Sequence, residues 1–389
     1  VTSAGMALGG TKAENYNLTS VATTTANITG LALTGNFTAD NKVYDGNTTA
    51  TVLTRTLTGV LPADVADVTL NGGTASFATA DVATGKTVTS TGMTLAGTKA
   101  GNYTLSSVAT TTANITGLPL TGSFTAANKV YDGTNAATIL TRTLTGVLPA
   151  DAADVTLTAG TAIFGGINTG NGKEVGSTGM VLTGAKSGNY TLFAVNTTTA
   201  NITAKDITGT FTAANKAYDG NTTASILTRS LSGVVPADVA DVTLTGGTAT
   251  FATATVGTGK TVTSTGMILG GTKAENYNLT SIATTTANIT GLALTANFTA
   301  DNKVYDGNNT ATILTRTLTG VLPADAADVT INGGTATFAN ADKGTGKTVT
   351  ATGITLTGTK AANYKLASIA STTADITRKD ITRTFTPGN

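Results

Sequence analysis

The chain has 389 residues and a formal net charge of +1, and charged residues make up only 12% of it. A sequence without a large basic field has little to attract phosphate backbones or anionic lipid, so we expect no nucleic acid partner. Cysteine, histidine and tryptophan are absent, which excludes disulfides, thiolate nucleophiles, imidazole bases and the common zinc ligand sets.

The organising feature is a tandem repeat with a period of 87 residues. The motif Asn-Lys-Val-Tyr-Asp-Gly at 41–46 returns three times, with one change or none. Its tyrosines stand 87 residues apart, at Tyr44, Tyr131, Tyr218 and Tyr305. A second marker, Asn-Tyr, keeps the same step at Tyr103, Tyr190, Tyr277 and Tyr364. An unbroken period of this length indicates a tandem array of one folded module.

The phase of the apolar alternation locates the module boundaries. Ile115 would share a strand face with Gly117 and Pro119, but the next apolar residues are Leu118 and Leu120. Because a shift of one residue turns every side chain to the opposite face, the boundary falls at Gly117. Junctions this short favour a semi-rigid string of modules. The predicted division is the C-terminal part of a repeat at 1–29, complete repeats at 30–116, 117–203, 204–290 and 291–377, and the first strand of a further repeat at 378–389.

Each complete repeat is predicted to contain seven or eight short strands. In the first complete repeat they fall at 31–37, 49–55, 68–70, 75–77, 86–95, 102–105 and 111–116. Asn-Gly-Gly at 71–73 predicts the turn of a tight hairpin, Gly92 predicts a bend, and Pro62 marks a loop. Many strands spaced by turns are typical of a β-sandwich. We therefore predict an all-β fold, a tandem array of sandwich modules. No apolar run approaches the roughly 20 residues that span a bilayer, so we expect no membrane insertion.

The segment 99–105 resembles the approach to strand F of immunoglobulin domains, where Asp-x-Gly-x-Tyr-x-Cys is usual. Leu105 stands in place of the cysteine, and Lys99 stands where the usual acid would be. The resemblance implies an immunoglobulin-like sandwich in which the tyrosine hydroxyl bonds to backbone a few residues upstream. The tyrosines that would form this corner are Tyr103, Tyr190, Tyr277 and Tyr364.

A second resemblance covers every complete repeat. In the first, its residues are 43–46, 67–70, Phe77, 84–88 and 101–105. They are similar to the YDG-type (MBG-related) bacterial immunoglobulin-like repeats of large secreted surface proteins, including filamentous-haemagglutinin-like adhesins. One departure is Ala-Asp-Val-Ala-Asp at 63–67, where that family tends to have Gly-Asp-Asp. The resemblance implies an extracellular stalk, at the bacterial cell surface or secreted, that carries no catalytic residues.

The Tyr-Asp-Gly motif has two interpretations. As a binding site, it would be presented once per module. As a structural motif, Asp45 and Gly46 close a turn, while Tyr44 packs its ring and satisfies its hydroxyl at the surface. We favour the structural interpretation, since every module needs its turns and only some need a ligand.

Two devices could stiffen the modules. Asp64 and Asp67 are the carboxylates that suggest calcium, but calcium binds about six to eight oxygens and the repeat 30–116 contains no glutamate. Lys42 with Asn114 and Asp45 raises an internal isopeptide crosslink, although nothing in the sequence sets the spacing. Solvated loop acids and an exposed lysine are the simpler interpretation. We predict no cofactor.

An enzyme is not expected. No histidine stands beside a serine or threonine nucleophile, and no Gly-rich phosphate loop or paired-carboxylate motif stands out. The predicted function is a structural stalk or filament segment of a bacterial extracellular adhesin, which spaces a distal binding domain from the cell surface. Its expected partners are neighbouring repeats in the same chain, and the incomplete repeats at 1–29 and 378–389 suggest a window of a longer array.

Two alternatives stay open. One is a self-assembling extracellular fibre, in which other copies of the chain are the partners. Exposed strand edges with few guarding lysines would favour it, because open edges template pairing. The other is a module that binds a host or surface glycan or protein once per repeat.

Overall fold

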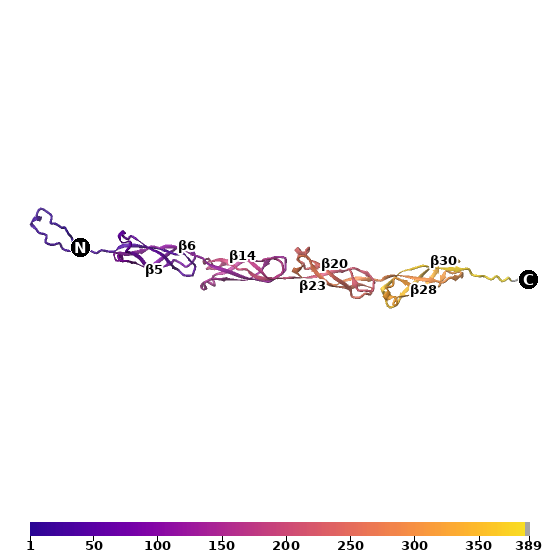
Figure 1. Ribbon diagram of the computed structural model, residues 1–389. Helices are drawn as coiled ribbons and strands as arrows, with labels where there is room; N and C mark the ends of the chain where they lie inside the picture. The colour runs from indigo at the N-terminus through magenta and orange to yellow at the C-terminus, as the bar shows by residue number, and fades with distance from the viewer. Residues whose placement is uncertain (386–389) are drawn as a thin grey trace. The chain divides into compact units, whose positions relative to one another are not determined.

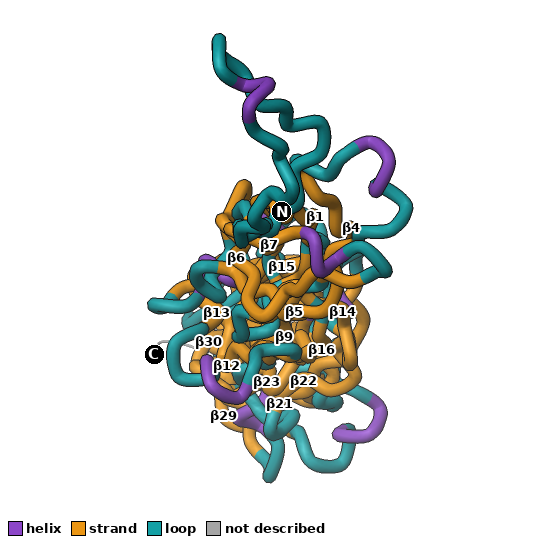
Figure 2. Tube along the Cα trace, turned by 90° about the vertical axis from the view of Figure 1, so that its left-hand side faces the viewer, coloured by secondary structure: helices purple, strands orange, loops and turns teal. Residues whose placement is uncertain are grey.

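The computed structural model describes residues 1–385, and the chain divides into two compact units. Unit 1 comprises Val1–Asn128, Asn135–Gly166 and Gly172–Asn201, and unit 2 comprises Lys129–Thr134, Ile167–Asn171 and Ile202–Asn389. Strands dominate, and they are joined by loops and single-turn 3-10 helices (Figure 2). The predicted all-β fold is confirmed. Within residues 1–385, no helix is long and apolar enough to cross a membrane.

The first complete repeat lies in unit 1 and contains eight strands. Two of them, β5 and β6, are labelled in Figure 1. They are β1 (Leu31–Ala39), β2 (Lys42–Val43), β3 (Thr49–Ala50), β4 (Val52–Thr58), β5 (Thr69–Phe77), β6 (Ala83–Ala96), β7 (Tyr103–Val108) and β8 (Thr111–Thr116). One sheet has the strand order β4-β1-β7 and the other has the order β2-β8-β6-β5-β3. Two 3-10 helices, η2 (Pro62–Asp64) and η3 (Ala100–Asn102), lie in the loops. The predicted number of strands is confirmed.

The same elements and the same sheet orders recur along the chain. The second repeat has β9 (Leu118–Ala126), β10 (Lys129–Val130), β11 (Ala136–Ala137), β12 (Ile139–Thr145), η4 (Pro149–Asp151), β13 (Thr156–Phe164), β14 (Gly170–Thr183), η5 (Ser187–Asn189), β15 (Tyr190–Val195) and β16 (Thr198–Thr203). The third has β17 (Lys205–Ala213), β18 (Lys216–Ala217), β19 (Thr223–Ala224), β20 (Ile226–Ser232), η6 (Pro236–Asp238), β21 (Thr243–Phe251), β22 (Gly257–Gly270), η7 (Ala274–Asn276), β23 (Tyr277–Ile282) and β24 (Thr285–Thr290). The fourth has β25 (Leu292–Ala300), β26 (Lys303–Val304), β27 (Thr310–Ala311), β28 (Ile313–Thr319), η8 (Pro323–Asp325), β29 (Thr330–Phe338), β30 (Gly344–Thr357), η9 (Ala361–Asn363), β31 (Tyr364–Ile369) and β32 (Thr372–Thr377).

Alternation along the strands places one apolar row between the two sheets. In the first repeat Phe37 comes from one sheet, and Phe77, Val88 and Ile115 come from the other, and all four pack in one buried cluster. Successive side chains of a strand point to opposite faces, so the polar residues between them face outward. Each fully buried side chain of this size contributes about 1.5–3 kcal/mol relative to exposure. The repeat is therefore a two-sheet sandwich.

The predicted tight hairpin at 71–73 is wrong. Strand β5 continues through these residues and pairs antiparallel with β6 in one register, from Thr69 opposite Ala96 to Phe77 opposite Val88. Gly72, Gly73 and Gly92 all have positive φ values. Glycine adopts this conformation without a Cβ penalty, so the strand kinks and changes the phase of its apolar residues without reversing direction.

The incomplete repeats at both ends form no strand among the described residues. Residues 1–30 contain only a single-turn 3-10 helix, η1 (Ala13–Asn15), and residues 378–385 are irregular. The prediction of a first strand at 378–389 is wrong for 378–385, and residues 386–389 lie outside the described chain. In complete repeats β7 pairs with β1, and β8 pairs with β2 and β6. The end segments lack these partners, and an unpaired strand has no ladder to stabilise it.

The connections between repeats are single residues. Gly117 separates β8 from β9, Ala204 separates β16 from β17, and Gly291 separates β24 from β25. The phase change predicted at Gly117 therefore coincides with a strand break. So short a connection brings the end of one repeat directly against the start of the next.

Candidate functional site

The Tyr-Asp-Gly motif forms the predicted turn. Asp45 accepts a hydrogen bond from the backbone N–H of Asn47 at 3.1 Å. Its carboxylate also forms an ion pair with Lys42 at 2.6 Å. Gly46 has φ of +79°, which favours glycine. A Cβ at Gly46 would also lie 3.2 Å from Cδ1 of Leu148, a residue of the next repeat. Asp45 therefore closes the turn, and Gly46 leaves room for Leu148 of the next repeat.

Tyr44 leaves this turn and is buried against the next repeat. Its hydroxyl donates to Oδ2 of Asp151 at 2.8 Å, and the hydroxyl of Tyr190 donates to the same oxygen at 2.7 Å. The two rings meet edge to face, with centroids 5.4 Å apart and planes at 74°. Asp151 lies in η4, at the turn after Pro149. One buried carboxylate therefore joins tyrosines from two successive repeats.

Unit 2 contains the same arrangement twice. Asp238 accepts from Tyr131 at 2.7 Å and from Tyr277 at 2.6 Å. Asp325 accepts from Tyr218 at 2.9 Å and from Tyr364 at 2.7 Å. We call these three clusters the tyrosine–aspartate junctions, and their members are Tyr44 with Asp151 and Tyr190, Tyr131 with Asp238 and Tyr277, and Tyr218 with Asp325 and Tyr364.

An asparagine next to the second tyrosine completes each junction. The side-chain oxygen of Asn189 accepts the backbone N–H of Val82 at 2.9 Å, and its amide donates to Asp81 at 3.0 Å. Asn276 accepts from Thr169 and Asn363 accepts from Val256 in the same way, at 2.8 Å and 3.0 Å. The asparagines are buried. A buried amide that satisfies a backbone donor of the preceding repeat fixes the register of the two repeats.

Burial and hydrogen bonding shift the pKa values of the junction tyrosines and aspartates. Burial, then the hydrogen bond to Asp151, raises the pKa of Tyr44 to about 12. Burial, then a hydrogen bond to the shared aspartate, also raises the pKa of Tyr277 and that of Tyr364 to about 12. Burial opposes ionisation of Asp238, but hydrogen bonds from Tyr277 and Tyr131 outweigh it and lower its pKa. The junction thus favours neutral tyrosines around an ionised aspartate.

The tyrosine corner differs from its prediction. The hydroxyl of Tyr103 accepts the backbone N–H of Leu61 at 3.4 Å, 42 residues upstream rather than a few. It donates to Oδ2 of Asp64 at 2.7 Å. Tyr190, Tyr277 and Tyr364 make the same pair of bonds. The hydroxyl of Tyr103 therefore holds the loop after β4, and not the backbone that leads into β7, the strand of Tyr103 itself.

The stiffening candidates are engaged in other contacts. Asp64 is buried and bonded to Tyr103 and Lys99, while Asp67 accepts from Thr98. Within residues 1–385, no group of three or more acidic, histidine or cysteine side chains could hold a metal ion. Lys42 contacts Asp45, Asn47 and Thr49, whereas the side chain of Asn114 accepts the N–H of Gly85. These contacts do not place Lys42 against Asn114.

Sequence reasoning missed the acceptor of the junction. It placed the hydroxyl of Tyr44 at the surface, but Tyr44 is only 4% exposed. It also interpreted Asp64 as a solvated loop acid, although this position is buried in every complete repeat, at Asp64, Asp151, Asp238 and Asp325. The available signal was Pro-Ala-Asp, which recurs with the 87-residue step at 62–64, 149–151, 236–238 and 323–325.

Comparison with protein families decides what these repeats are. The model of the YDG domain matches four times, at residues 31–113, 111–200, 203–287 and 290–374. The chain belongs to the YDG domain family. In the first repeat each residue of the YDG motif has a structural role. Tyr44 donates to Asp151 of the next repeat, Asp45 closes the turn, and Gly46 leaves room for Leu148.

Comparisons with curated proteins and with solved structures give no further relationship that bears on function. No curated protein matches the chain. Among solved structures, the Bacillus anthracis TIE protein is similar at 10% sequence identity and a TM-score of 0.17. The alignment covers 80% of this chain, which spans 58% of the length of that protein. A likeness this low carries no argument about fold or function.

Proposed function

We propose that this YDG array is a structural spacer, a stalk or filament segment of an extracellular bacterial adhesin that holds a distal binding domain away from the cell. The observation that carries the proposal is the tyrosine–aspartate junction, which fixes one repeat against the next at Asp151, Asp238 and Asp325. A mechanical role requires no catalytic residue, and we propose none. The extracellular location is supported by the resemblance to repeats of large secreted surface proteins.

A spacer needs connections between repeats that resist bending. Each junction combines a one-residue connection, two hydrogen bonds to a charged acceptor and an edge-to-face ring pair. Hydrogen bonds to charged groups contribute about 1.5–3 kcal/mol, and aromatic pairs about 0.5–1.5 kcal/mol. In unit 1 the apolar core also continues through the junction, since Leu120, Val155 and Tyr190 belong to the cluster of the first repeat.

Small-angle X-ray scattering of the full chain tests this proposal. The decisive variant is Tyr44→Phe/Tyr131→Phe/Tyr218→Phe, which removes the tyrosine–aspartate hydrogen bonds between repeats and keeps each repeat's own tyrosine–aspartate bond. At a concentration where the chain is monomeric, we expect a single conformation to account for the scattering of the wild type, whereas the triple variant should require a mixture of conformations that differ in the angles between repeats. Tyr305→Phe is the matched control and should leave the scattering unchanged. A wild type whose scattering already requires such a mixture, unaltered by the triple variant, would contradict the spacer.

A second candidate function is a repeated binding module, and one recurring groove favours it. In the first repeat the groove lies between the end of β4 and the start of β5 and is lined by Arg55, Leu57, Val65 and Thr69 among others. Equivalent grooves occur at Arg229 and Arg316. The ligand would be a host or surface glycan or protein, and a glycan array with no hits would count against the glycan form.

A further inference from the structure

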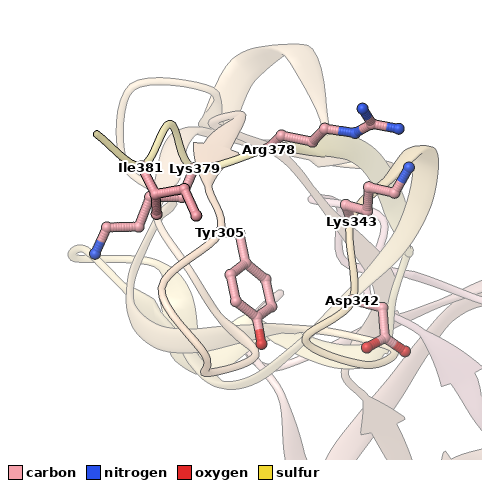
Figure 3. Close-up of a pocket in the computed structure, with 6 residues that line it drawn as sticks. All are labelled: Tyr305, Asp342, Lys343, Arg378, Lys379 and Ile381. Atoms are coloured by element: carbon pink, nitrogen blue, oxygen red, sulfur yellow. The ribbon is translucent and has the colours of Figure 1, made fainter. Parts of the chain in front are cut away.

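Each complete repeat contains a single arginine, which stands at the same position every time. The four residues are Arg55, Arg142, Arg229 and Arg316, each 87 residues from the next. Three of them line the recurring groove between the end of β4 and the start of β5, or between the equivalent strands. We call this groove the arginine groove. The hollow beside Tyr305 is a separate feature, because Lys379 and Ile381, beyond the fourth repeat, line it (Figure 3).

The arginine is held by the opposite wall of the groove. Nε of Arg55 donates to the backbone carbonyl of Gly72 on β5, 3.1 Å away. The same bonds in the other repeats are 2.8–3.2 Å long and join Arg142 to Ala159, Arg229 to Gly246 and Arg316 to Gly333. Within residues 1–385, none of the four arginines forms a salt bridge with a carboxylate. A guanidinium has five N–H donors, so its positive charge and most of its donors stay available to a ligand.

Apart from its arginine, the groove is uncharged and mainly aliphatic. In the first repeat its walls include Leu57, Val60, Val65, Val68 and Leu70. Among the described residues, no second charged side chain lines the groove in the first, third or fourth repeat. The three volumes are about 560, 420 and 490 Å³, which lie in the range of ligand sites. A lone cation beside aliphatic walls is complementary to an anionic group attached to an apolar one.

The walls of the groove favour a peptide over a glycan. A sugar ring carries several hydroxyls, and each hydroxyl that loses water needs a new hydrogen-bond partner. In the first repeat the polar side chains that line the groove are Arg55, Thr56 and Thr69. Among the described residues, no aromatic ring lines any of the three grooves, so a sugar ring has no flat apolar surface to stack on. Aliphatic side chains of a peptide, in contrast, gain free energy by burial against these walls.

We propose that the arginine groove binds a peptide segment in which an aspartate or glutamate lies between aliphatic residues, a refinement that rests on the second candidate function. The carboxylate accepts two parallel N–H bonds from the guanidinium, the geometry that arginine offers to carboxylates. The aliphatic side chains on either side cover Leu57, Val65 and Leu70. Because Arg55 is already held by Gly72, little rotamer freedom is lost on binding. A ligand with several such segments gains avidity from the recurrence of the groove along the chain.

Binding of the full chain to peptides immobilised at high density tests the proposal. All probes are N-acetylated and C-terminally amidated, so that only side chains carry carboxylates. The first probe is Ser-Leu-Asp-Leu-Ser, the second has asparagine in place of aspartate, and the third has serine in place of both leucines. We expect the first probe to bind about tenfold more tightly than either of the others, because each of them lacks one half of the contact. Equal binding of the three probes, or no binding of the first, would overturn the proposal.

A fourfold variant locates the binding in the groove. Arg55→Gln/Arg142→Gln/Arg229→Gln/Arg316→Gln should bind the first probe about tenfold more weakly, and circular dichroism checks that it is folded. The matched control, Lys86→Gln/Lys173→Gln/Lys260→Gln/Lys347→Gln, removes the same charge outside the groove and should bind as the wild type does. An arginine variant that binds the first probe as strongly as the wild type would overturn the proposal.

An immobilised glucuronic acid oligosaccharide separates the peptide ligand from the candidate function on which it rests. We expect the wild type to bind the first peptide probe and not this acidic glycan. A chain that binds the glycan through its arginines, and binds no peptide probe, would overturn the peptide ligand and leave the repeated binding module standing. A chain that binds neither the peptides nor the glycan would count against both.

Discussion

Tyr44 and Tyr305 occupy the same position of the same motif, yet their surroundings are opposite. Tyr44 is 4% exposed and bonded to Asp151, whereas Tyr305 is 43% exposed at an open hollow. The turn beneath them is the same, since Asp306 pairs with Lys303 as Asp45 pairs with Lys42. The difference in exposure between Tyr44 and Tyr305 therefore comes from the repeat that packs on Tyr44. The Tyr-Asp-Gly motif supplies one half of an interface, and the following repeat supplies the other half.

Asp64 and Asp151 form the complementary comparison. Both lie in a 3-10 helix after proline and both accept from a tyrosine of their own repeat. Asp151 also accepts from Tyr44 of the preceding repeat. At Asp64, Lys99 approaches to 3.1 Å, whereas its equivalent Lys186 turns to Asp81 of the preceding repeat. The equivalent lysine of the third junction, Lys360, stays 2.6 Å from Asp325, so forming a junction does not by itself move this lysine to the preceding repeat.

Alkaline pH should have the largest effect, because it acts on every junction at once. The pKa values of Tyr44, Tyr277 and Tyr364 are raised to about 12 by burial and by their aspartates. An unfolded tyrosine titrates near pH 10, so the unfolded chain loses these protons first. The stabilisation is complete below about pH 10 and is lost as pH rises towards about 12. Thermal melts from pH 8 to 12, followed by circular dichroism, should show the melting temperature fall in that window, and a flat profile would contradict the buried junction.

Removing a junction carboxylate should have the next largest effect. Asp151→Ala leaves the hydroxyls of Tyr44 and Tyr190 without a charged acceptor, which should cost about 3 kcal/mol in local stability. Native-state hydrogen exchange of peptides from 117–203 measures this loss. Asp64→Ala is the matched control and should cost less, since one tyrosine is affected instead of two. Equal losses at the two positions would mean that Tyr44 contributes nothing.

Removing one hydroxyl should have a smaller effect that separates the two tyrosines. Tyr44→Phe keeps the ring pair with Tyr190 and deletes one buried hydrogen bond, for an expected cost of about 1–2 kcal/mol. Tyr305→Phe should change the stability of the monomeric chain by less than about 0.5 kcal/mol, as exposed substitutions usually do. Hydrogen exchange of the first and fourth repeats, at a concentration where the chain is monomeric, gives both values.

Much of the fold was predictable because its signals are local. The alternation along 31–37 and the Asp-Gly turn depend on neighbouring residues, and they predicted the strands and the turn. The 87-residue period can be counted directly in the sequence, and it predicted the repeat. The hairpin at 71–73 failed because Asn-Gly-Gly permits either a turn or a kinked strand, and pairing with β6 decides between them. The strand at 378–385 failed because its alternation has no paired neighbour in the structure.

The candidate site was harder to predict because its partners are 107 residues apart in different repeats. A tyrosine beside a turn looks the same in sequence whether the next module covers it or not. Asp64 looked like a loop acid for the same reason, although its recurrence with Pro-Ala marked a position that every repeat needs. Pairing two recurring polar residues across a repeat boundary is the step that the sequence alone did not supply.

A double-mutant cycle on Tyr44 and Asp151 tests the junction most directly, with Tyr44→Phe, Asp151→Asn and the double variant compared by hydrogen exchange. We expect a coupling energy of about 1 kcal/mol or more, because the hydroxyl of Tyr44 reaches the carboxylate of Asp151 only when the two repeats are docked. The control pair Tyr305→Phe with Asp151→Asn should be additive within about 0.5 kcal/mol. A coupling energy near zero for Tyr44 and Asp151 would contradict the claim that YDG repeats are joined by this junction.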